Sequence, residues 1–305
     1  MRFFVGITDR DWFEHLSAIE DLDELNFWQP SGNVQFRALQ IGEPFLFKLH
    51  SPDNFIVGGG FFSHSSIMPV SLAWQAFGVK NGAASEDEMR GRIEKYRRMP
   101  TSSKEDHRIG CILLESPFFF LREDWVPLPG WAQSIVRGKS YDSDVNGKEI
   151  WDRVRSILSV QQATEKAFGQ TVGRFGEPQV VFPRLGQGSF RIIVTDLYKK
   201  RCAFTGSPVL HVLEAAHIRP YARGGTHDPQ NGILLRQDLH TLFDRGYMTV
   251  TPDFRVEVSR RIKDEFNNGR EYYALHGSSV AVPQQESVRP ERSLLLWHAE
   301  NIYQG

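Results

Sequence analysis

The stretch LEAAHIRPYARGGTHDPQNGILLRQDLHTLFDRG, residues 213–246, decides the fold of the C-terminal part of this chain. Its pattern predicts a strand over residues 209–216, a loop with glycines and prolines, a short strand over 232–235 and a helix over 237–244. His217 stands where the first strand ends, Asn231 comes 14 residues later, and His240 lies on the helix. The stretch therefore places two histidines and an asparagine at the ends of consecutive elements.

These residue types suit the hydrolysis of a phosphodiester, which needs a base, a divalent metal and groups that hold both in place. His217 is a candidate base because the imidazole pKa lies near neutrality. Asn231 can orient that base without competing for the proton. His240 is a candidate metal ligand, and Asp244 lies one turn later on the same helical face. A histidine and a carboxylate in this arrangement can share one metal ion.

The segment resembles the HNH (ββα-metal) nuclease family, in the branch seen in predicted restriction endonucleases. The resemblance covers roughly residues 183–303. Its most specific parts are RLGQGSFR (184–191), EAAHIRPYARGG (214–225), NGILL (231–235) and LHTLFDRG (239–246). The resemblance implies metal-dependent cleavage of DNA, with His217 as general base, Asn231 as orienting residue and His240 as metal ligand.

One position departs from the family pattern. Many HNH proteins have Asp or His as a metal ligand just before the first histidine, where this chain has Ala216. Asp244, Glu214, or water and the scissile phosphate must then complete the metal shell. Mg²⁺ tolerates a sparse protein shell with several waters, so it is the first choice, with Mn²⁺ or another transition metal as alternatives.

The remaining polar residues of this region divide into two groups. His211 and His227 are interpreted as ordinary packed or surface histidines. Candidate contacts to DNA are Arg184, Gln187, Arg191, Arg219 and Arg223, although the first three are equally well explained as a solvated basic face.

The first 135 residues predict a small curved β structure with a few helices. Strands are expected over residues 3–7, 44–49, 54–62, 111–114 and 118–121, and a helix over 85–97 with Ser85 as N-cap and Glu88 as its capping-box partner. Gly58, Gly59 and Gly60 indicate a bulge or sharp bend in the third strand.

The order of strands and aromatics in this part looks like the PUA-like barrel group, which includes EVE and SRA-type readers of modified bases. Reading a flipped base needs aromatic faces and a few polar groups. Candidate pocket residues are Asn26, Phe27, Trp28, Trp74 and Phe77, with Gln29 and Asn81 as further polar edges. The alternative is that these aromatics are core residues.

The chain length of 305 residues fits about two domains. We expect an α+β chain made of a PUA-like β-barrel domain over residues 1–135, a helical linker over 136–182 and a ββα-metal HNH domain over 183–305. Residues 1–150 carry a net charge of −5 and residues 151–305 one of +4, which favours the second half as the partner of a polyanion. Without a secretory signal, a membrane-spanning run or a disulfide scaffold, the chain is expected to be soluble and cytoplasmic.

The leading hypothesis is a modification-dependent restriction endonuclease. Its first domain would recognise a modified cytosine in double-stranded DNA and its HNH domain would cut, and a homodimer is expected because one HNH centre cuts one strand. A second hypothesis keeps the nuclease but makes the first domain a sensor of another ligand or of RNA. A third is a DNA-binding protein with a catalytically weak HNH fold, which only Ala216 favours.

Overall fold

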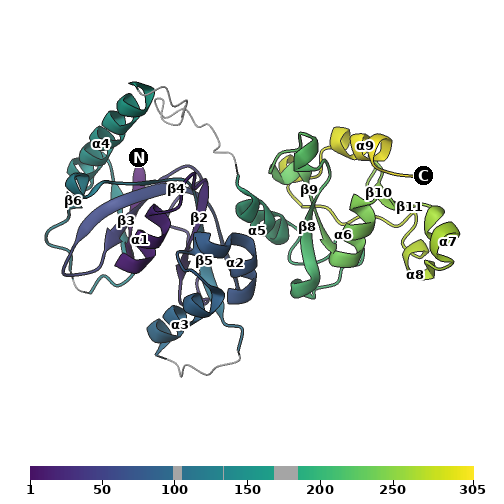
Figure 1. Ribbon diagram of the computed structural model, residues 1–305, viewed down its shortest axis with the longest axis horizontal. Coiled ribbons are helices and arrows are strands. Elements are labelled where there is room, and N and C mark those ends of the chain that lie inside the picture. Colours follow the sequence, from purple (N-terminus) through teal and green to yellow (C-terminus); the bar gives the residue numbers. More distant parts are fainter. Residues whose placement is uncertain (99–104, 133, 168–184) are drawn as a thin grey trace. The chain divides into compact units, whose positions relative to one another are not determined.

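The computed structural model describes residues 1–98, 105–132, 134–167 and 185–305. The chain forms two compact units, Met1–Pro183 and Arg184–Gly305, and each contains both helices and strands (Figure 1). The chain is therefore of the predicted α+β class. Residues 168–182 of the expected helical linker and the candidate contact Arg184 lie outside the described residues.

The N-terminal unit is built on one mixed sheet. Its strands are β1 (Arg2–Thr8), β2 (Glu24–Gln29), β3 (Pro44–Leu49), β4 (Phe55–Pro69), β5 (Arg108–Phe119), β6 (Val126–Pro127) and β7 (Gly138–Asp142). Its helices are α1 (Arg10–Ser17), α2 (Val70–Phe77), α3 (Glu86–Arg97) and α4 (Lys148–Ala167), with the 3₁₀ helices η1 (Gly78–Asn81) and η2 (Arg122–Asp124). The strand order is β2-β5-β4-β3-β1-β7, and β6 pairs with β4.

Among the strand pairs that the structure describes in this sheet, β1–β3 alone is parallel. In the described residues the end strands β2 and β7 do not pair with each other, so the closure of the sheet into a barrel stays a prediction.

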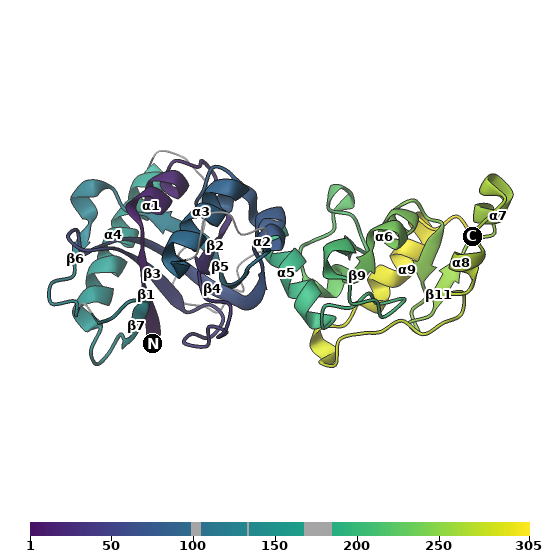
Figure 2. The same ribbon diagram turned by 90° about the horizontal axis from the view of Figure 1, so that it is seen from below.

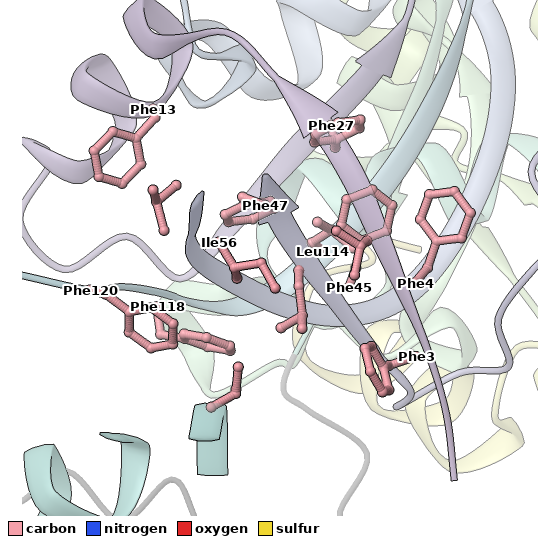
Figure 3. Packing of buried hydrophobic residues seen from close by; sticks show 14 of the residues in the cluster. Phe3, Phe4, Phe13, Phe27, Phe45, Phe47, Ile56, Leu114, Phe118 and Phe120 are labelled. Atoms are coloured by element: carbon pink, nitrogen blue, oxygen red, sulfur yellow. The ribbon is translucent and has the colours of Figure 1, made fainter. Parts of the chain in front are cut away.

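Aromatic side chains fill the core of this unit. Phe3, Phe45 and Phe47 are fully buried. Figure 3 shows the rings of Phe45 and Phe47 gathered with those of Phe4 and Phe27, whereas the Phe3 ring lies apart and stacks on Tyr141. Phe27 lies 4.6 Å from Phe45 between ring centroids. Burying each such ring contributes about 1.5–3 kcal/mol, so these aromatics contribute substantially to the stability of the unit.

The glycine triplet lies at a break in the β4 register, as predicted. Pairing with β5 shifts between Gly59 and Phe61. A Cβ on Gly58 would come within 2.3 Å of the Phe118 carbonyl oxygen, and one on Gly59 within 2.7 Å of the Phe45 carbonyl oxygen. Larger side chains are excluded here because the neighbouring backbones approach too closely.

Two local expectations need correction. The strands predicted over residues 111–114 and 118–121 are one strand, β5, because the chain passes Ser116 with a positive φ of 46° and resumes its pairing with β4. Ser85 does cap α3 by accepting from the Glu88 N–H, but the Glu88 carboxylate accepts from the Ala84 N–H rather than from that of Ser85.

Glu115 is a fully buried carboxyl on β5, and it faces Glu24 across the β2–β5 pair. Burial raises the pKa of Glu115 to about 8, opposed by a contact with Ser63 and supported by the charge of Glu24. The folded state therefore keeps a proton that the unfolded chain releases above its ordinary pKa of 4.5. Its contribution to stability is complete below that value and is lost as the pH rises toward 8.

Replacing Glu115 with glutamine is expected to remove this loss, because an amide needs no proton to stay neutral. Wild-type protein should lose up to about 1.4 kcal/mol of unfolding free energy per pH unit across this window, whereas the variant should not. Urea unfolding at about pH 5.5 and about pH 8 measures the difference. Glu123→Gln, at an exposed position, is the matched control, and an unchanged pH dependence in Glu115→Gln would contradict the expectation.

The C-terminal unit contains the decisive stretch. Its strands are β8 (Leu213–His217), β9 (Gly232–Arg236), β10 (Met248–Val250) and β11 (Val256–Val258). Its helices are α5 (Gln187–Leu197), α6 (Gln237–Asp244), α7 (Arg261–Phe266), α8 (Arg270–Tyr273) and α9 (Arg292–Asn301), with η3 (Leu210–Val212), η4 (Tyr221–Arg223), η5 (Pro229–Asn231) and η6 (Glu286–Val288). The predicted strand–loop–strand–helix order is confirmed. Strands β10 and β11 pair in antiparallel fashion as a hairpin.

Strands β8 and β9 pair in antiparallel fashion, with His217 opposite Gly232 and Glu214 opposite Leu235. Leu239 and Phe243 of α6 are fully buried in the core of the unit. The first predicted strand is shorter than expected, because residues 210–212 form the 3₁₀ helix η3 before β8 begins.

Helix α6 is held at its C-terminal end by a buried histidine of α9, and Figures 1 and 2 show the two helices side by side. The His298 ring stacks on Phe243 at 3.8 Å. Its Nε2 lies 3.2 Å from the Phe243 carbonyl oxygen and its Nδ1 lies 2.8 Å from the Thr249 hydroxyl. Because a carbonyl only accepts, Nε2 carries the proton and Nδ1 accepts from Thr249. These contacts of His298 hold α6, the helix that carries His240, against α9 and β10.

Candidate functional site

Asn231 holds the loop between β8 and β9 closed. Its side chain is buried, accepts from the Arg219 N–H at 2.8 Å, and donates to the carbonyl oxygens of Arg219 at 3.0 Å and Thr226 at 2.8 Å. The Ile218 N–H also donates to the Asn231 carbonyl oxygen at 2.9 Å. Asn231 thus fixes the segment that follows His217, which is consistent with the orienting part predicted for it.

The loop is tight enough to require a glycine beside Asn231. A Cβ on Gly225 would lie 1.9 Å from the Arg219 carbonyl oxygen. Further along, Asp228 caps η5 by accepting from the Gln230 N–H at 2.8 Å. The loop between β8 and β9 is therefore restrained by hydrogen bonds and close backbone contacts along most of its length.

His217 is half-buried at the end of β8. Its ring stacks on Phe190 of α5 with 4.1 Å between ring centroids and 12° between planes. Its Nε2 lies 3.0 Å from Nδ1 of His227. Burial lowers the pKa of His217 to about 4, with further lowering by His227 and His240 and an opposing effect of Asp244. At neutral pH the imidazole is uncharged, which is the state a base requires.

His240 lies between two carboxylates. Its Nδ1 is 2.7 Å from Oε2 of Glu214 on β8, and its Nε2 is 3.2 Å from Oδ2 of Asp244 on its own helix. Burial acts to lower the pKa of His240, but the hydrogen bonds with Asp244 and Glu214 outweigh it and the pKa is raised. The three residues that the sequence singled out as candidate metal ligands are therefore brought together.

An imidazole nitrogen and a carboxylate oxygen on one helix face are donors that a divalent cation accepts, so these residues fit the expected metal. Among the described residues, no group of three or more His, Cys, Asp or Glu is arranged to hold an ion. A histidine nitrogen with one carboxylate would leave the other ligand positions of a divalent cation to water or substrate.

Ala216 cannot supply the missing ligand for two reasons. It has no donor atom, and its side chain is fully buried in the core of the unit. A cation next to His240 would have to take its remaining ligands from Asp244, water or the substrate.

The candidate DNA contacts differ in their surroundings. Gln187 is exposed at the start of α5, and Arg191, one turn later, is half-buried. Burial lowers the pKa of Arg191, and the charge of Glu214 opposes this shift. Arg219 donates to the Arg223 carbonyl oxygen at 2.8 Å and lies 5.0 Å above the Trp297 ring, while Arg223 is exposed. Arg191 is therefore a candidate contact whose charge interacts with Glu214, the carboxylate that binds Nδ1 of His240.

His227 is the residue that the sequence interpretation missed. It was expected to be an ordinary packed or surface histidine, yet it contacts His217 directly. His211, placed in the same class, is exposed in η3. His227 lies between Thr226, whose carbonyl Asn231 binds, and Asp228, which caps η5. The sequence offers one signal for this contact: His227 lies in the short segment between His217 and Asn231.

The N-terminal unit has a cavity of about 500 Å³ at the ends of β1 and β2. Two of the five predicted pocket residues, Phe27 and Trp28, line it, together with Gln29. The other lining residues are Ile7, Thr8, Asp9, Trp12, Pro30, Ser31, Gly32, Asn33, His50, Tyr96, Arg97, Val136 and Arg137.

The other predicted pocket residues do not line this cavity. Asn26 is buried and donates to the Asn81 side chain at 2.8 Å, Phe77 is buried, and Trp74 lies half-buried on α2. The Trp28 indole N–H donates to the Asn81 carbonyl oxygen at 2.9 Å, which fixes its ring at the cavity wall. Asn81 therefore acts as a structural anchor for β2.

Polar groups gather on one side of this cavity. The Asp9 carboxylate accepts from the Tyr96 hydroxyl at 2.5 Å and lies 3.5 Å from Nε2 of His50. The Tyr96 ring meets that of Trp28 edge-on at 6.4 Å. The cavity thus combines aromatic walls with a carboxylate acceptor.

Among solved structures, the chain is similar to ASCH from Zymomonas mobilis, with 13% identity over 50% of this chain and 94% of that chain and a TM-score of 0.31. It is also similar to the modification-dependent TagI restriction endonuclease, with 14% identity over 93% of this chain and 77% of that chain and a TM-score of 0.30. No curated protein matches the chain. In the described residues, no helix is long and apolar enough to cross a membrane.

The family model HNH_2, described as HNH endonuclease, matches residues 202–251. The match contains β8, β9 and α6, with His217, Asn231 and His240. The geometry of these elements and the family match agree, and residues 202–251 are an HNH endonuclease domain.

Proposed function

We propose that this protein is a modification-dependent DNA endonuclease, in which the HNH domain hydrolyses phosphodiesters and the N-terminal unit reads a modified cytosine. The observation that supports it most is that Nε2 of His240 and Oδ2 of Asp244 lie 3.2 Å apart on α6, which packs against β8, the strand that ends at His217. A histidine–carboxylate pair and an imidazole at the end of the neighbouring strand match the cation site and the base that phosphodiester hydrolysis needs.

In this proposal His217 removes a proton from the attacking water, and Asn231 keeps the loop that follows His217 in place. Nε2 of His240 and the Asp244 carboxylate hold the divalent cation, which when bound stabilises negative charge on the phosphate. Glu214 binds Nδ1 of His240, so it orients the imidazole, as carboxylates behind metal-bound histidines do. Arg191 and the exposed Arg223 bind phosphates of the DNA.

The cavity of the N-terminal unit is the proposed base pocket. Trp28 and Tyr96 offer aromatic surface, and the Asp9 carboxylate can accept from an exocyclic amino group such as that of cytosine. This placement differs from the sequence prediction, because Asn26, Trp74 and Phe77 take no part in it.

Plasmids that carry unmodified, methylated or hydroxymethylated cytosine test the function directly. With Mg²⁺ or Mn²⁺, the protein should cut modified plasmids and spare the unmodified one. Nicked circles would indicate that one active centre cuts one strand. Linear product would indicate that two centres cut both strands, as in a homodimer. Equal cutting of every plasmid would support the nuclease activity but contradict the proposed recognition of modified bases. Absence of cutting with any metal, with no difference from His217→Ala, would favour a DNA-binding protein.

Replacing Trp28 with alanine is expected to lower cutting of the modified plasmid without affecting the HNH domain. Loss of a stacking face costs about 1–3 kcal/mol per base, which corresponds to a drop in affinity for modified DNA of about 5- to 150-fold. Binding is measured by fluorescence anisotropy with modified and unmodified duplexes. Trp74→Ala, outside the cavity, is the matched control and should keep the preference. A preference that survives Trp28→Ala and is lost in Trp74→Ala would place the pocket elsewhere.

Replacing His240 with alanine is expected to weaken metal binding by at least about tenfold, because it removes the proposed nitrogen ligand. Titration calorimetry with Mn²⁺ measures this without any DNA. His211→Ala removes an exposed histidine of the same unit and should bind the metal like the wild type. Equal metal affinity of the wild type and His240→Ala would mean that His240 is not a ligand.

A further inference from the structure

His227 and His217 form a contact between two imidazoles that nothing in the proposed function requires. Nε2 of His217 lies 3.0 Å from Nδ1 of His227. The outer faces of the two rings are covered, that of His217 by Phe190 at 4.1 Å and that of His227 by Tyr221 at 4.8 Å with 5° between planes. The rings are thus held from both sides, and the nitrogen–nitrogen contact lies between them.

The loop gives His227 a defined position. Asn231 binds the carbonyl oxygen of Thr226, directly before His227, and Asp228, directly after it, caps η5. The backbone on both sides of His227 is therefore fixed by hydrogen bonds. A side chain placed this firmly can determine which nitrogen of its partner carries the proton.

The contact uses up one nitrogen of His217. Since one imidazole must donate and the other accept, the two uncharged rings can arrange their protons in two ways. If His227 donated, His217 would carry its proton on Nδ1 and have no lone pair left for water. If His217 donates from Nε2, its Nδ1 keeps the lone pair, and in the described residues no hydrogen bond is made to that atom.

We propose that His227 is a positioning residue that accepts the Nε2 proton of His217 and so makes Nδ1 the atom that takes the proton from the attacking water. This inference rests on the proposed nuclease function and adds to it the identity of the basic nitrogen and the residue that selects it. In the step, the water proton moves to Nδ1, the hydroxide oxygen attacks phosphorus, and His217 becomes an imidazolium whose Nε2–H stays hydrogen-bonded to His227. The bond between phosphorus and the leaving oxygen breaks, and that oxygen takes a proton from solvent.

Two substitutions separate this role from ring stacking. His227→Asn places an amide oxygen close to the position of Nδ1, so it can accept from Nε2 of His217 but cannot stack on Tyr221. His227→Phe keeps the stack with Tyr221 and has no acceptor. We expect His227→Phe to lower the single-turnover cleavage rate by about 10- to 100-fold, the range typical of partners that orient metal-bound histidines through one hydrogen bond. His227→Asn should stay within a few-fold of the wild type. The reverse order would show that His227 only packs the loop and would overturn the proposal.

A second measurement does not depend on cleavage. In protein labelled with ¹⁵N-histidine and free of metal, long-range ¹H–¹⁵N spectra at neutral pH should show His217 protonated at Nε2 and unprotonated at Nδ1. His227→Asn should keep this pattern, and His227→Phe should show a mixture of both tautomers. Protonation at Nδ1 in the wild type, or a pattern unchanged in His227→Phe, would overturn the inference. If the wild type cuts no DNA, the proposed function fails, and the spectra alone still decide whether His227 selects the tautomer.

Discussion

Replacing His217 with alanine is expected to reduce DNA cleavage by about 10²- to 10⁴-fold, the usual contribution of a general base. In the proposed function His217 takes the proton from the attacking water, and no other side chain is assigned this step. The fold should persist, because His217 is half-buried at a strand end and the removed ring packs mainly on Phe190. Single-turnover cleavage of modified plasmid measures the effect, with circular dichroism to monitor folding.

The matched control is His211→Ala, which should cut at the wild-type rate. The pH dependence provides a further check on the wild type. A base works only when unprotonated, and burial lowers the pKa of His217 to about 4. Protons also compete with the metal for His240, whose pKa is raised, so the profile is measured with the metal kept at saturating concentration at every pH. Under that condition the cleavage rate should not fall as the pH drops through the ordinary histidine pKa of 6.5 and should decline only as the pH approaches 4. With saturating metal, a rate that halves near pH 6.5, or full activity of His217→Ala, would contradict the assignment of the base.

Replacing Asn231 with alanine is expected to have the second largest effect, because it acts on stability and activity together. The change removes three hydrogen bonds and leaves one N–H and two carbonyl groups of the loop without their partner. An unpaired buried polar group costs about 1–3 kcal/mol. The loop should open, and since it carries His227 and follows His217 directly, cleavage should fall by about 10²-fold.

Two measurements separate these consequences. Urea unfolding gives the loss in free energy of unfolding. Amide hydrogen exchange shows whether the Arg219 N–H, which donates to Oδ1 of Asn231 in the wild type, exchanges faster in the variant. Asn268→Ala, at an exposed position, is the matched control and should leave both unchanged. Unaltered protection of the Arg219 amide in Asn231→Ala would mean that the loop does not depend on this side chain.

Much of the HNH fold could be predicted because its signals are local. The bounds of α6 follow from the apolar Leu239 and Phe243 on one helical face, and β9 follows from the short apolar run after Asn231. The strand β5 was harder, because Ser116 and Pro117 look like a break between two strands. Pairing with β4 on both sides of this point keeps the strand continuous, and such long-range pairing leaves no mark in the local sequence.

The pocket residues of the N-terminal unit show the same limit. Asn26, Phe27 and Trp28 are consecutive in β2, yet only the last two line the cavity. The alternation of a strand predicts that neighbouring side chains face opposite sides of the sheet. It does not predict that η1 packs over Asn26, where the Asn81 side chain accepts a hydrogen bond from it. Tyr96 and Asp9 are 87 residues apart, and the cavity that joins them exists only after the helix α3 has packed.

The sequence by itself determined the strand–loop–strand–helix frame and the order of His217, Asn231 and His240 along it, because turn residues and apolar spacing act over a few neighbours. Only the tertiary structure decided which groups these residues contact. Glu214 reaches His240 across 26 residues and His227 reaches His217 across 10. Both contacts depend on the register of β8 against β9 and on the path of the loop that Asn231 closes, and these are set by packing and by hydrogen bonds between distant segments.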